Sequence, residues 1–410
     1  MRVAIARGRI SHSISSELRD LIQSLYSPLT DEKKVREFEF KIAEYLNSEI
    51  PIFFPFARTG FFSILETLNL PVGSKILMPT ITIKPLLDVA LHFKLNPILV
   101  DLDIGTGCWD LTSLRKALEE KPQVALLTYL FGVVPNLEEI LPELERSNTI
   151  IIEDFSQAFG AQFAGKSIGT LGHFGICSTS TTKTLDTYGG ALVFSKNGSH
   201  LVGLRNFQLR LKNPKRITLV KKIVKNLVRN FATNKFIFSA VTFPAIRLIN
   251  SQKKQQVGKF TGDRSLSPIL KIPIEWFEAP TAFQAKIGLR ELSLQEDKDR
   301  RRKSIAQRYI DEIPGIGPRG NRMGASVYWQ YISVEKSPIL LRDFLNNRFI
   351  DCATTSLVKL SELSEYGLVQ NLSGTNAIYE RGVYLPCYHQ LTYKEQSRVI
   401  GAVKTFYEIK

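Results

Sequence analysis

An apolar run that ends abruptly in acid is the feature that most restricts the fold of this chain. Residues 149–152 read Thr-Ile-Ile-Ile, a short and β-branched run of the kind that forms a buried strand. Glu153 and Asp154 follow at once. Because ligands of α/β sheets bind at the carboxyl ends of the strands, this pair predicts a polar site at one edge of a sheet.

More polar groups follow from the next elements of the chain. Gln157 lies three residues beyond Asp154. A second predicted strand, residues 174–180, passes through Ser178 and stops before Lys183, and a Gly-Gly pair then turns the chain into a third apolar run. The sequence therefore predicts an acid, an amide, a hydroxyl and one lysine at the same edge of the sheet.

This set of groups suits the chemistry of pyridoxal phosphate. A carboxylate beside the pyridinium nitrogen keeps the ring protonated, and a lysine holds the aldehyde of the cofactor covalently. A single Asp at a strand end, or a single Lys in a polar loop, is more often structural. The fixed order and spacing of all four groups favour a cofactor site over that interpretation.

The same stretch resembles the DegT-type aminotransferases, sugar aminotransferases with the aspartate-aminotransferase fold. They carry Asp after a strand, Gln three residues later, a glycine-rich middle, Ser five residues before Lys, and a Gly-Gly return. This chain has these features at Asp154, Gln157, Gly165, Gly169, Gly172, Ser178, Lys183, Gly189 and Gly190. The resemblance covers residues 33–200 and 275–408.

The resemblance implies an α/β fold, that of the type I PLP-dependent transferases. We expect a large domain with a mostly parallel central sheet flanked by helices, and a smaller C-terminal α+β domain. The expected boundaries are an N-terminal extension at 1–30, the PLP-binding domain at 31–204, a basic amphipathic insertion at 205–270, and a linking helix with the small domain at 271–410.

The resemblance also implies roles for individual residues. Lys183 and Asp154 are the expected catalytic pair: Lys183 holds the cofactor and moves the α-proton of the substrate, and Asp154 keeps the ring nitrogen protonated. Gln157 is expected on the hydroxyl side of the ring. The full expected cofactor-binding set is Thr59, Gly60, Asp154, Gln157, Ser178 and Lys183.

Thr59 and Gly60 stand between a predicted strand, residues 52–56, and a helix predicted over residues 61–68. Small and hydroxyl residues at a helix start leave backbone amides free, and these bind phosphate together with the helix dipole. An ordinary Thr N-cap is the alternative. The family binds the cofactor phosphate at this position, which favours the first interpretation.

The chain departs from the family pattern at two places. The family stacks an aromatic side chain on the pyridine ring where this chain has Ile83. It also supplies an Asn and an Arg across a dimer interface, and alignment on Gln284 and Ala285 puts Phe277 and Ala279 at those positions. A further residue, Tyr129, is expected either in the pocket or in the core.

An acid-free segment accounts for the unusual charge of the chain. From Thr187 to Gly262 there is no Asp or Glu but there are fifteen Lys and Arg, against a net charge of +15 for the whole protein. Residues 215–231 predict a helix with one apolar and one basic face. We expect residues 212–254 to dock on an anionic membrane surface. A helix that packs on a partner or a second subunit is the alternative; nucleic acid would leave the apolar face uncovered.

Other classes of protein are disfavoured by composition. The four cysteines are scattered and form no CxxC pair, so neither a metal site nor a disulfide framework is expected. The first residues contain no sustained apolar core, and no window reaches about 18 uncharged apolar residues. We expect a cytoplasmic protein that lies on the inner face of the cytoplasmic membrane if the basic segment docks there.

The expected function is transfer of an amino group from an amino acid, L-glutamate by resemblance, to a keto-sugar. The sugar would be nucleotide- or lipid-linked and belong to cell-surface polysaccharide or secondary-metabolite biosynthesis, and the family implies a homodimer. Relatives with histidine in place of the lysine dehydrate sugars instead, but Lys183 argues against that reaction. A catalytically decayed scaffold or membrane-associated binding protein remains the non-enzymatic alternative, favoured by Ile83 and the missing Asn and Arg.

Overall fold

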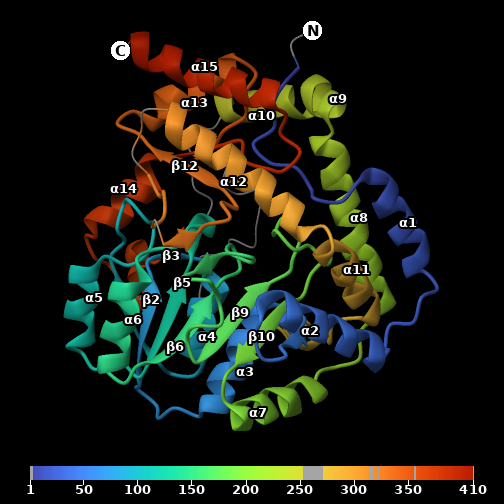
Figure 1. The fold of residues 1–410 in the computed structure, drawn as a ribbon, viewed down its shortest axis with the longest axis vertical. Helices are drawn as coiled ribbons and strands as arrows, with labels where there is room; N and C mark the ends of the chain where they lie inside the picture. The colour runs from blue at the N-terminus through green and yellow to red at the C-terminus, as the bar shows by residue number, and fades with distance from the viewer. Residues whose placement is uncertain are drawn as a thin grey trace.

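The computed structural model describes residues 3–252, 271–313, 315, 317–321, 323–354 and 357–409. A seven-stranded sheet with the order β1-β10-β9-β6-β5-β2-β4 forms the centre of the larger part (Figure 1). Its strands are β1 (Ile52–Phe54), β2 (Lys75–Pro79), β4 (Asn96–Val100), β5 (Val124–Thr128), β6 (Ile150–Asp154), β9 (Phe174–Ser178) and β10 (Ala191–Ser195). Within this sheet β10 runs antiparallel to both neighbours and the other pairings are parallel, which confirms the expected mostly parallel sheet.

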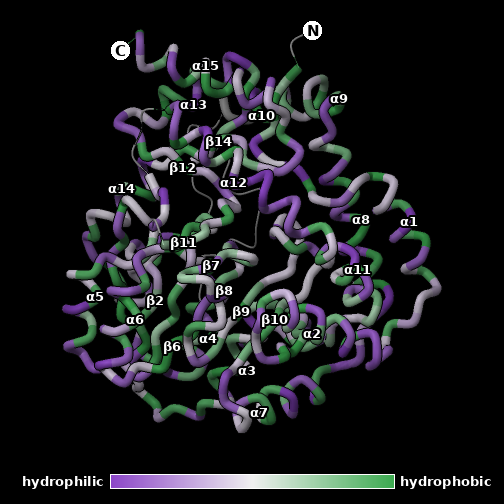
Figure 2. Tube along the Cα trace, in the orientation of Figure 1, coloured by the Kyte–Doolittle hydropathy of each residue, from purple (hydrophilic) through white to green (hydrophobic). Residues whose placement is uncertain are grey.

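Helices cover both faces of this sheet, so its strands are apolar on both sides. The residues of β5 and β10 are all buried, and the tube of β2 and β6 is largely hydrophobic (Figure 2). One face packs against α2 (Glu32–Leu46), α5 (Leu111–Leu118) and α6 (Leu137–Arg146). The other packs against α3 (Ala57–Leu68), α4 (Lys84–His92) and α7 (Gly198–Leu209).

The predicted start of α3 at residue 61 is wrong. The helix begins at Ala57, so Thr59 and Gly60 lie in its first turn and Phe56 is the N-cap residue. Gly60 is accommodated inside the helix, and its lack of a side chain allows the helix to pack closely on the sheet. A Cβ atom there would lie 2.5 Å from Cγ2 of Val193 on β10. The interpretation of Thr59 as an ordinary N-cap is therefore also wrong.

The smaller C-terminal part is built on two antiparallel strands, β12 (Tyr331–Val334) and β14 (Gly382–Leu385). Around them lie α12 (Gln295–Glu312), α13 (Pro338–Asn347), α14 (Ser373–Arg381) and α15 (Tyr393–Ile409). The single linking helix expected from residue 282 to 310 is two helices, because α11 (Ala282–Leu292) ends before α12 begins. Short pairs complete the fold: β3 (Ile81–Thr82) with β13 (Val358–Lys359), and β7 (Gln162–Phe163) with β8 (Lys166–Ser167) and β11 (Gly324–Ala325).

The first residues and the basic segment pack on each other. Residues 3–12 run along the C-terminal part, where Ile5 pairs with Ile350, and α1 (Ile14–Ser24) then packs on α8 (Arg216–Thr233). Figure 1 shows α1, α8 and α11 side by side. Beyond α8 the chain continues as α9 (Lys235–Ile237), a π-helical turn (Phe238–Thr242) and α10 (Phe243–Gln252). The end of the expected insertion, residues 253–270, lies outside the described residues.

The expected single apolar face of α8 is divided between the interior and the surface. The helix buries Leu219, Ile223, Asn226, Leu227 and Asn230. The apolar face expected from the sequence comprises Ile217, Val220, Ile223, Val224, Leu227, Val228 and Phe231. Four of these side chains are exposed, namely Ile217, Val224, Val228 and Phe231. In the part of the chain that the structure describes, no helix combines the length and the hydropathy that crossing a membrane requires.

Candidate active site

The expected site residues meet at one edge of the central sheet because their strands are neighbours. Phe54, at the end of β1, and Ser178, at the end of β9, both lie opposite Ala191 of β10. Asp154 ends β6, the next strand, where it pairs with Ile176. The first turn of α3, the hydroxyl of Ser178 and the carboxylate of Asp154 are thus delivered by adjacent strands to the same sheet edge.

Glu153 and Asp154 occupy different environments although they are adjacent. The Glu153 carboxylate is fully buried and accepts four hydrogen bonds of 2.6 to 2.9 Å. The donors are the backbone N–H groups of Gly169, Leu171 and Gly172 and the hydroxyl of Tyr129. Glu153 therefore organises the glycine-rich turn, and Tyr129 belongs to the core rather than to the pocket.

Asp154 accepts fewer hydrogen bonds than Glu153. Its Oδ1 atom accepts a hydrogen bond from the Ser156 backbone N–H at 3.0 Å, and the residue is only 9 % exposed. Burial raises the pKa of Asp154, and the bonds from Ser156 and the charge of Lys183 oppose part of that shift. A buried carboxylate in this state is stabilised by a cationic ligand group.

Gln157 is held in place by an unusual turn. Its Oε1 atom accepts a hydrogen bond of 2.7 Å from the backbone N–H of Phe131, which has a positive φ of 62°. The next residue, Gly132, also has a positive φ, and a Cβ atom there would lie 2.6 Å from the Gln157 backbone oxygen. Because Oε1 is engaged, the amide nitrogen is the group that Gln157 can offer to an acceptor on a ligand.

Lys183 lies in the loop between β9 and β10, under an aromatic side chain. Its Nζ atom is 4.3 Å from the ring centroid of Trp329, whose Nε1 donates a hydrogen bond of 2.6 Å to the Thr182 carbonyl oxygen. Burial lowers the pKa of Lys183, and the carboxylate of Asp154 opposes part of that shift. Since each group shifts the pKa of the other, the expected catalytic pair occupies one site.

Trp329 is a site residue that the sequence reasoning missed. It stands two residues before β12, which begins at Tyr331. No local signal marks Trp329, because the groups that it covers lie 147 residues earlier in the chain. A tryptophan over a lysine excludes water from one side of the amine and stabilises its charged form.

The loop after Lys183 is held in place by polar and aromatic contacts with residues near the start of the chain. His12 is buried between Asp186, at 3.5 Å, and Glu291, at 3.1 Å, and its ring stacks on Tyr188. The Tyr188 hydroxyl donates to Asp20 of α1 at 2.8 Å. Burial alone would lower the pKa of His12, but the two carboxylates reverse that shift and raise the pKa to about 10. The sequence reasoning assigned none of these groups to the site.

At the end of the site where α3 begins, the hydroxyl groups of Thr59 and Ser178 already donate hydrogen bonds. Thr59 Oγ1 donates to the carbonyl oxygen of Trp276 at 2.7 Å, and Ser178 Oγ donates to Ser180 Oγ at 2.9 Å. The oxygen atoms of both can still accept. The first backbone N–H groups of α3, which lack partners within the helix, are the donors that this end offers to a phosphate.

The structure shows the surroundings of Ile83 and Phe277, which stand at the two departures from the family pattern. Ile83 is the N-cap residue of α4 and is 42 % exposed, so its side chain is not enclosed in the core. Phe277 packs instead against Phe62 and Phe207 of its own chain. Among the residues described here, no cluster of three or more His, Cys, Asp or Glu side chains could hold a metal ion.

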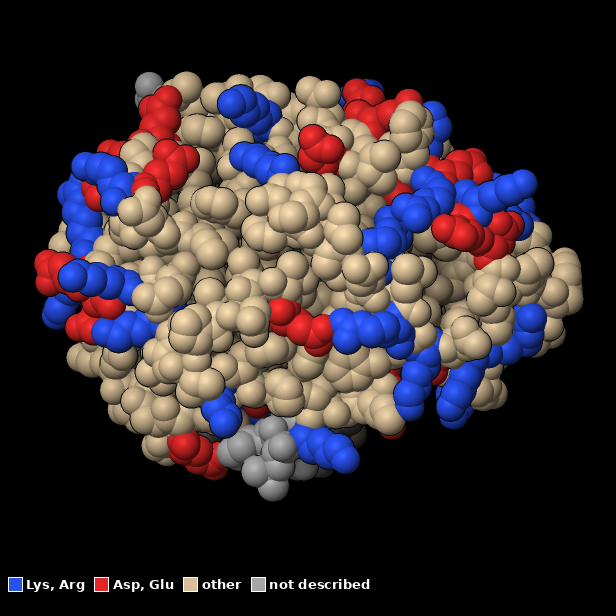
Figure 3. Space-filling model, turned by 90° about the horizontal axis from the view of Figure 1, so that it is seen from below, with Lys and Arg blue, Asp and Glu red and all other residues tan. Residues whose placement is uncertain are grey.

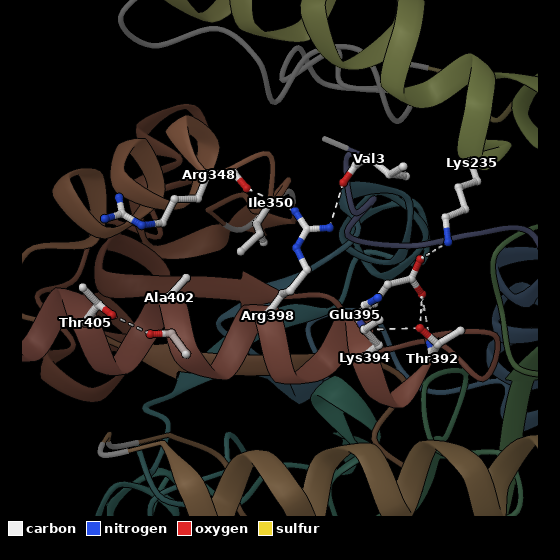
Figure 4. A pocket seen from close by; sticks show the side chains of 11 residues that line it. Val3, Lys235, Arg348, Ile350, Thr392, Lys394, Glu395, Arg398, Ala402 and Thr405 are labelled. Carbon is white, nitrogen blue, oxygen red and sulfur yellow. Dashed lines mark hydrogen bonds and ion pairs between the residues drawn. The ribbon is translucent and has the colours of Figure 1, made fainter. Parts of the chain in front are cut away.

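A cavity of about 700 Å³ lies between α15 and the first residues, and Lys183 does not line it (Figure 4). Three of its charged side chains, Arg398, Lys235 and Glu395, already have partners. Arg398 donates to the carbonyl oxygen of Val3 at 2.8 Å, and Lys235 pairs with Glu395 at 3.0 Å. Glu395 also forms a capping box with Thr392 at the start of α15. These contacts join α9 and the first residues to α15.

Comparison with known proteins assigns the chain to a family. The profile of the DegT/DnrJ/EryC1/StrS aminotransferase family matches residues 10–213 and 281–404. The chain belongs to this family. The match includes α1, His12 and the whole edge of the sheet where Asp154, Ser178 and Lys183 meet, and it leaves out α8.

Individual members of the DegT family match shorter stretches. GDP-perosamine synthase of Escherichia coli O157:H7 is 24 % identical over 163 residues, 40 % of this chain and 45 % of that protein. L-glutamine:scyllo-inosose aminotransferase of Streptomyces griseus is 27 % identical over 159 residues, 38 % of each. The chain spans about half the length, or less, of these curated relatives. Spr1654 of Streptococcus pneumoniae, solved in its PLP form, matches 100 % of this chain and 99 % of its own with a TM-score of 0.70 at 18 % identity, which shows the fold.

DegT-family aminotransferases depend on pyridoxal 5'-phosphate, which is therefore the cofactor of this fold. The residues present fit it. A desolvated carboxylate at Asp154, an amine at Lys183 and an amide nitrogen at Gln157 line one side of the sheet edge, and the start of α3 lies at its end.

Proposed function

We propose that this protein is an aminotransferase that moves an amino group from L-glutamate to a keto-sugar. The acceptor would be nucleotide- or lipid-linked, in the biosynthesis of a cell-surface polysaccharide or a secondary metabolite. The observation that carries the proposal is the shared, desolvated site of Lys183 and Asp154. Family membership and the sugar or cyclitol substrates in the names of the relatives support the acceptor class.

The residues of the site divide the work of such a reaction. Bound pyridoxal phosphate supplies an aldehyde that takes up the amino group and a ring that accepts electrons. Asp154 holds the proton on the ring nitrogen through a charge-assisted hydrogen bond. Lys183, whose pKa is lowered by burial, holds the cofactor and then moves the proton at the substrate α-carbon. Gln157 donates from its amide nitrogen to the ring oxygen, and Trp329 keeps water from the amine.

A half-reaction screen tests this proposal. Addition of L-glutamate to the cofactor-loaded protein should abolish the visible absorbance of the lysine-held cofactor, and the correct keto-sugar should restore it. L-glutamine is tested beside L-glutamate because one relative is named for it. A decayed scaffold would bind the cofactor but show no change with any amino donor, and that result would contradict an enzymatic function.

Two further proposals concern assembly. The homodimer with active sites at the interface rests on the family, and the exposed side of α8 supports docking of residues 212–254 on an anionic membrane. Val224, Val228 and Phe231 are exposed on α8, with Lys221 and Lys225 beside them. Apolar side chains flanked by lysines suit a lipid interface. Figure 3 shows the molecule from below, where basic and acidic side chains both occur, so this face carries no positive charge alone.

One pair of measurements tests both proposals on the same surface. Val228→Asp, at a position 62 % exposed, should abolish flotation with anionic vesicles, whereas Val72→Asp, at a position 73 % exposed on another part of the chain, should not. Light scattering should show a dimer of the 46.3 kDa chain. Flotation that ignores lipid charge and salt would refute membrane docking, and a fully active monomer would refute the dimer. If Val228→Asp dissociates the dimer instead, this face is the subunit interface.

A further inference from the structure

Lys222, on the inserted helix α8, reaches the end of the site where α3 begins. Its Nζ atom lies 5.1 Å from the ring centroid of Phe56, the N-cap residue of α3. A Cβ atom placed on Gly189 would lie 3.3 Å from the same nitrogen. Gly189 lies two residues before the start of β10, whose first residue, Ala191, lies opposite both the end of β1 and Ser178. The ammonium group is therefore brought to the sheet edge from an element that the family profile does not include.

The position of α8 is fixed by the loop that replaces the missing Asn and Arg. Lys212, just before α8, exchanges backbone hydrogen bonds of 2.8 Å with Phe277 and Ala279. The Glu278 carboxylate accepts from the Lys215 backbone N–H at 2.9 Å and from the Thr218 hydroxyl at 3.2 Å. The loop therefore offers no charged donor to the site itself, but it holds the start of α8 one turn before Lys222.

The surroundings of Lys222 are electropositive. The Arg58 guanidinium, in the first turn of α3, lies between the rings of Phe56 and Trp276 at 4.1 and 4.4 Å. Burial lowers the pKa of Lys222 to about 8; Glu278 opposes that shift and Arg58 adds to it. Among the described residues no carboxylate forms an ion pair with Lys222. Lys222 and Arg58 are thus two cations beside the N-terminus of α3, and the Glu278 carboxylate is engaged by hydrogen bonds to the start of α8. This arrangement favours the binding of an anion.

We propose that Lys222 binds the phosphate group of the cofactor, so that the inserted helix supplies within one chain the cation that relatives take from a second subunit. The inference rests on the proposed function, because it assigns the start of α3 to the phosphate. A phosphate dianion there satisfies the first backbone N–H groups of α3 and the charge of Lys222 together. The phosphate of a nucleotide-linked substrate has the same chemistry, and the experiment separates these two sources.

The test compares the affinity of the apoprotein for pyridoxal phosphate with its affinity for pyridoxal, which lacks the phosphate. Lys222→Met should raise the dissociation constant for pyridoxal phosphate by about 10- to 100-fold, as loss of a charge-assisted hydrogen bond does, and leave that for pyridoxal unchanged. Lys222→Arg should restore most of the affinity. Lys116→Met, at an exposed lysine on α5, is the control and should change neither constant.

A second readout does not depend on the cofactor ring. Inorganic phosphate should raise the unfolding temperature of the apoprotein, and this increase should be smaller in Lys222→Met. Equal loss of affinity for pyridoxal phosphate and pyridoxal would show a structural role and overturn the proposal. So would unchanged cofactor affinity with a raised KM for a nucleotide-sugar, which would assign Lys222 to the substrate phosphate. If the wild-type apoprotein binds neither pyridoxal compound, the proposed function itself fails, whatever Lys222→Met does.

Discussion

Replacing Lys183 with alanine should leave the fold intact and abolish amino transfer. The side chain contacts the ring of Trp329 but anchors no secondary-structure element, so its loss costs little stability. The variant loses both the covalent hold on the cofactor and the group that moves the substrate proton. A positioned acid–base group alone contributes roughly 10²- to 10⁴-fold to a rate, so the fall in kcat should be at least that large.

The measurements for Lys183→Ala are the visible absorbance of the loaded protein, its turnover and its thermal unfolding. Absorbance and turnover should be lost while the unfolding temperature stays close to that of the wild type. Lys166→Ala, at an exposed lysine on β8, should behave as the wild type in all three. Borohydride reduction of the loaded wild-type protein followed by peptide mapping should place the cofactor on Lys183. An adduct on another lysine would show that the assignment is wrong.

The elements that carry the expected site could be predicted because each is local. The run before Asp154 has the length and β-branching of a buried strand, and Ser178, Lys183 and the Gly-Gly pair follow at fixed spacing. Once the strands are parallel neighbours, their carboxyl ends must share an edge. The start of α3 was misplaced because Thr59 and Gly60 were interpreted as residues that precede the helix, whereas they lie in its first turn and Gly60 allows close contact with Val193.

The contacts that fasten the site could not be predicted, because they join segments far apart in the chain. His12 and Glu291 are 279 residues apart, and each alone is typical of a solvent-exposed polar residue. Their burial is possible because folding brings the two side chains within hydrogen-bonding distance of each other. No local sequence pattern predicts this contact. Lys298 shows the same limit: a lysine in a run of charged residues is typical of a solvated helix face, yet Lys298 is buried in an ion pair of 2.6 Å with Glu291.

The helical pattern of α8 was predicted, but the division of its apolar residues between the interior and the surface was not. Apolar residues at helical spacing predicted one apolar face, directed to lipid or to a partner. Asn226 and Asn230 are buried instead, because both donate to Glu17 of α1, at 2.7 and 2.8 Å. This polar contact turns the helix so that Val228 faces outward. A hydrophobicity pattern cannot anticipate this, because the partner lies in a segment interpreted as an extension.

Asp154→Asn should keep the cofactor bound and slow amino transfer by roughly 10²-fold or more, the effect of removing one electrostatic group at a site of developing charge. Asparagine has the size of aspartate and can still accept the Ser156 backbone hydrogen bond. As a neutral amide, however, it cannot hold a proton on the ring nitrogen. The measurement is single-turnover kinetics of the loaded protein with L-glutamate. Asp343→Asn, an exposed acid on α13, is the control and should react at the wild-type rate.

The pH dependence separates this role of Asp154 from a structural one. Burial raises the pKa of Asp154 in the protein without cofactor, and the protonated ring nitrogen of bound pyridoxal phosphate opposes that shift. In the wild type the carboxylate is lost, and the rate falls, as the pH drops through the pKa of Asp154 in the loaded protein, which gives the pH profile an acid limb. In Asp154→Asn the group that titrates is gone, so the low rate should no longer fall along that limb. A variant that turns over near the wild-type rate, or keeps the same acid limb, would refute the role, because either result means that the charge of Asp154 does not act on the ring.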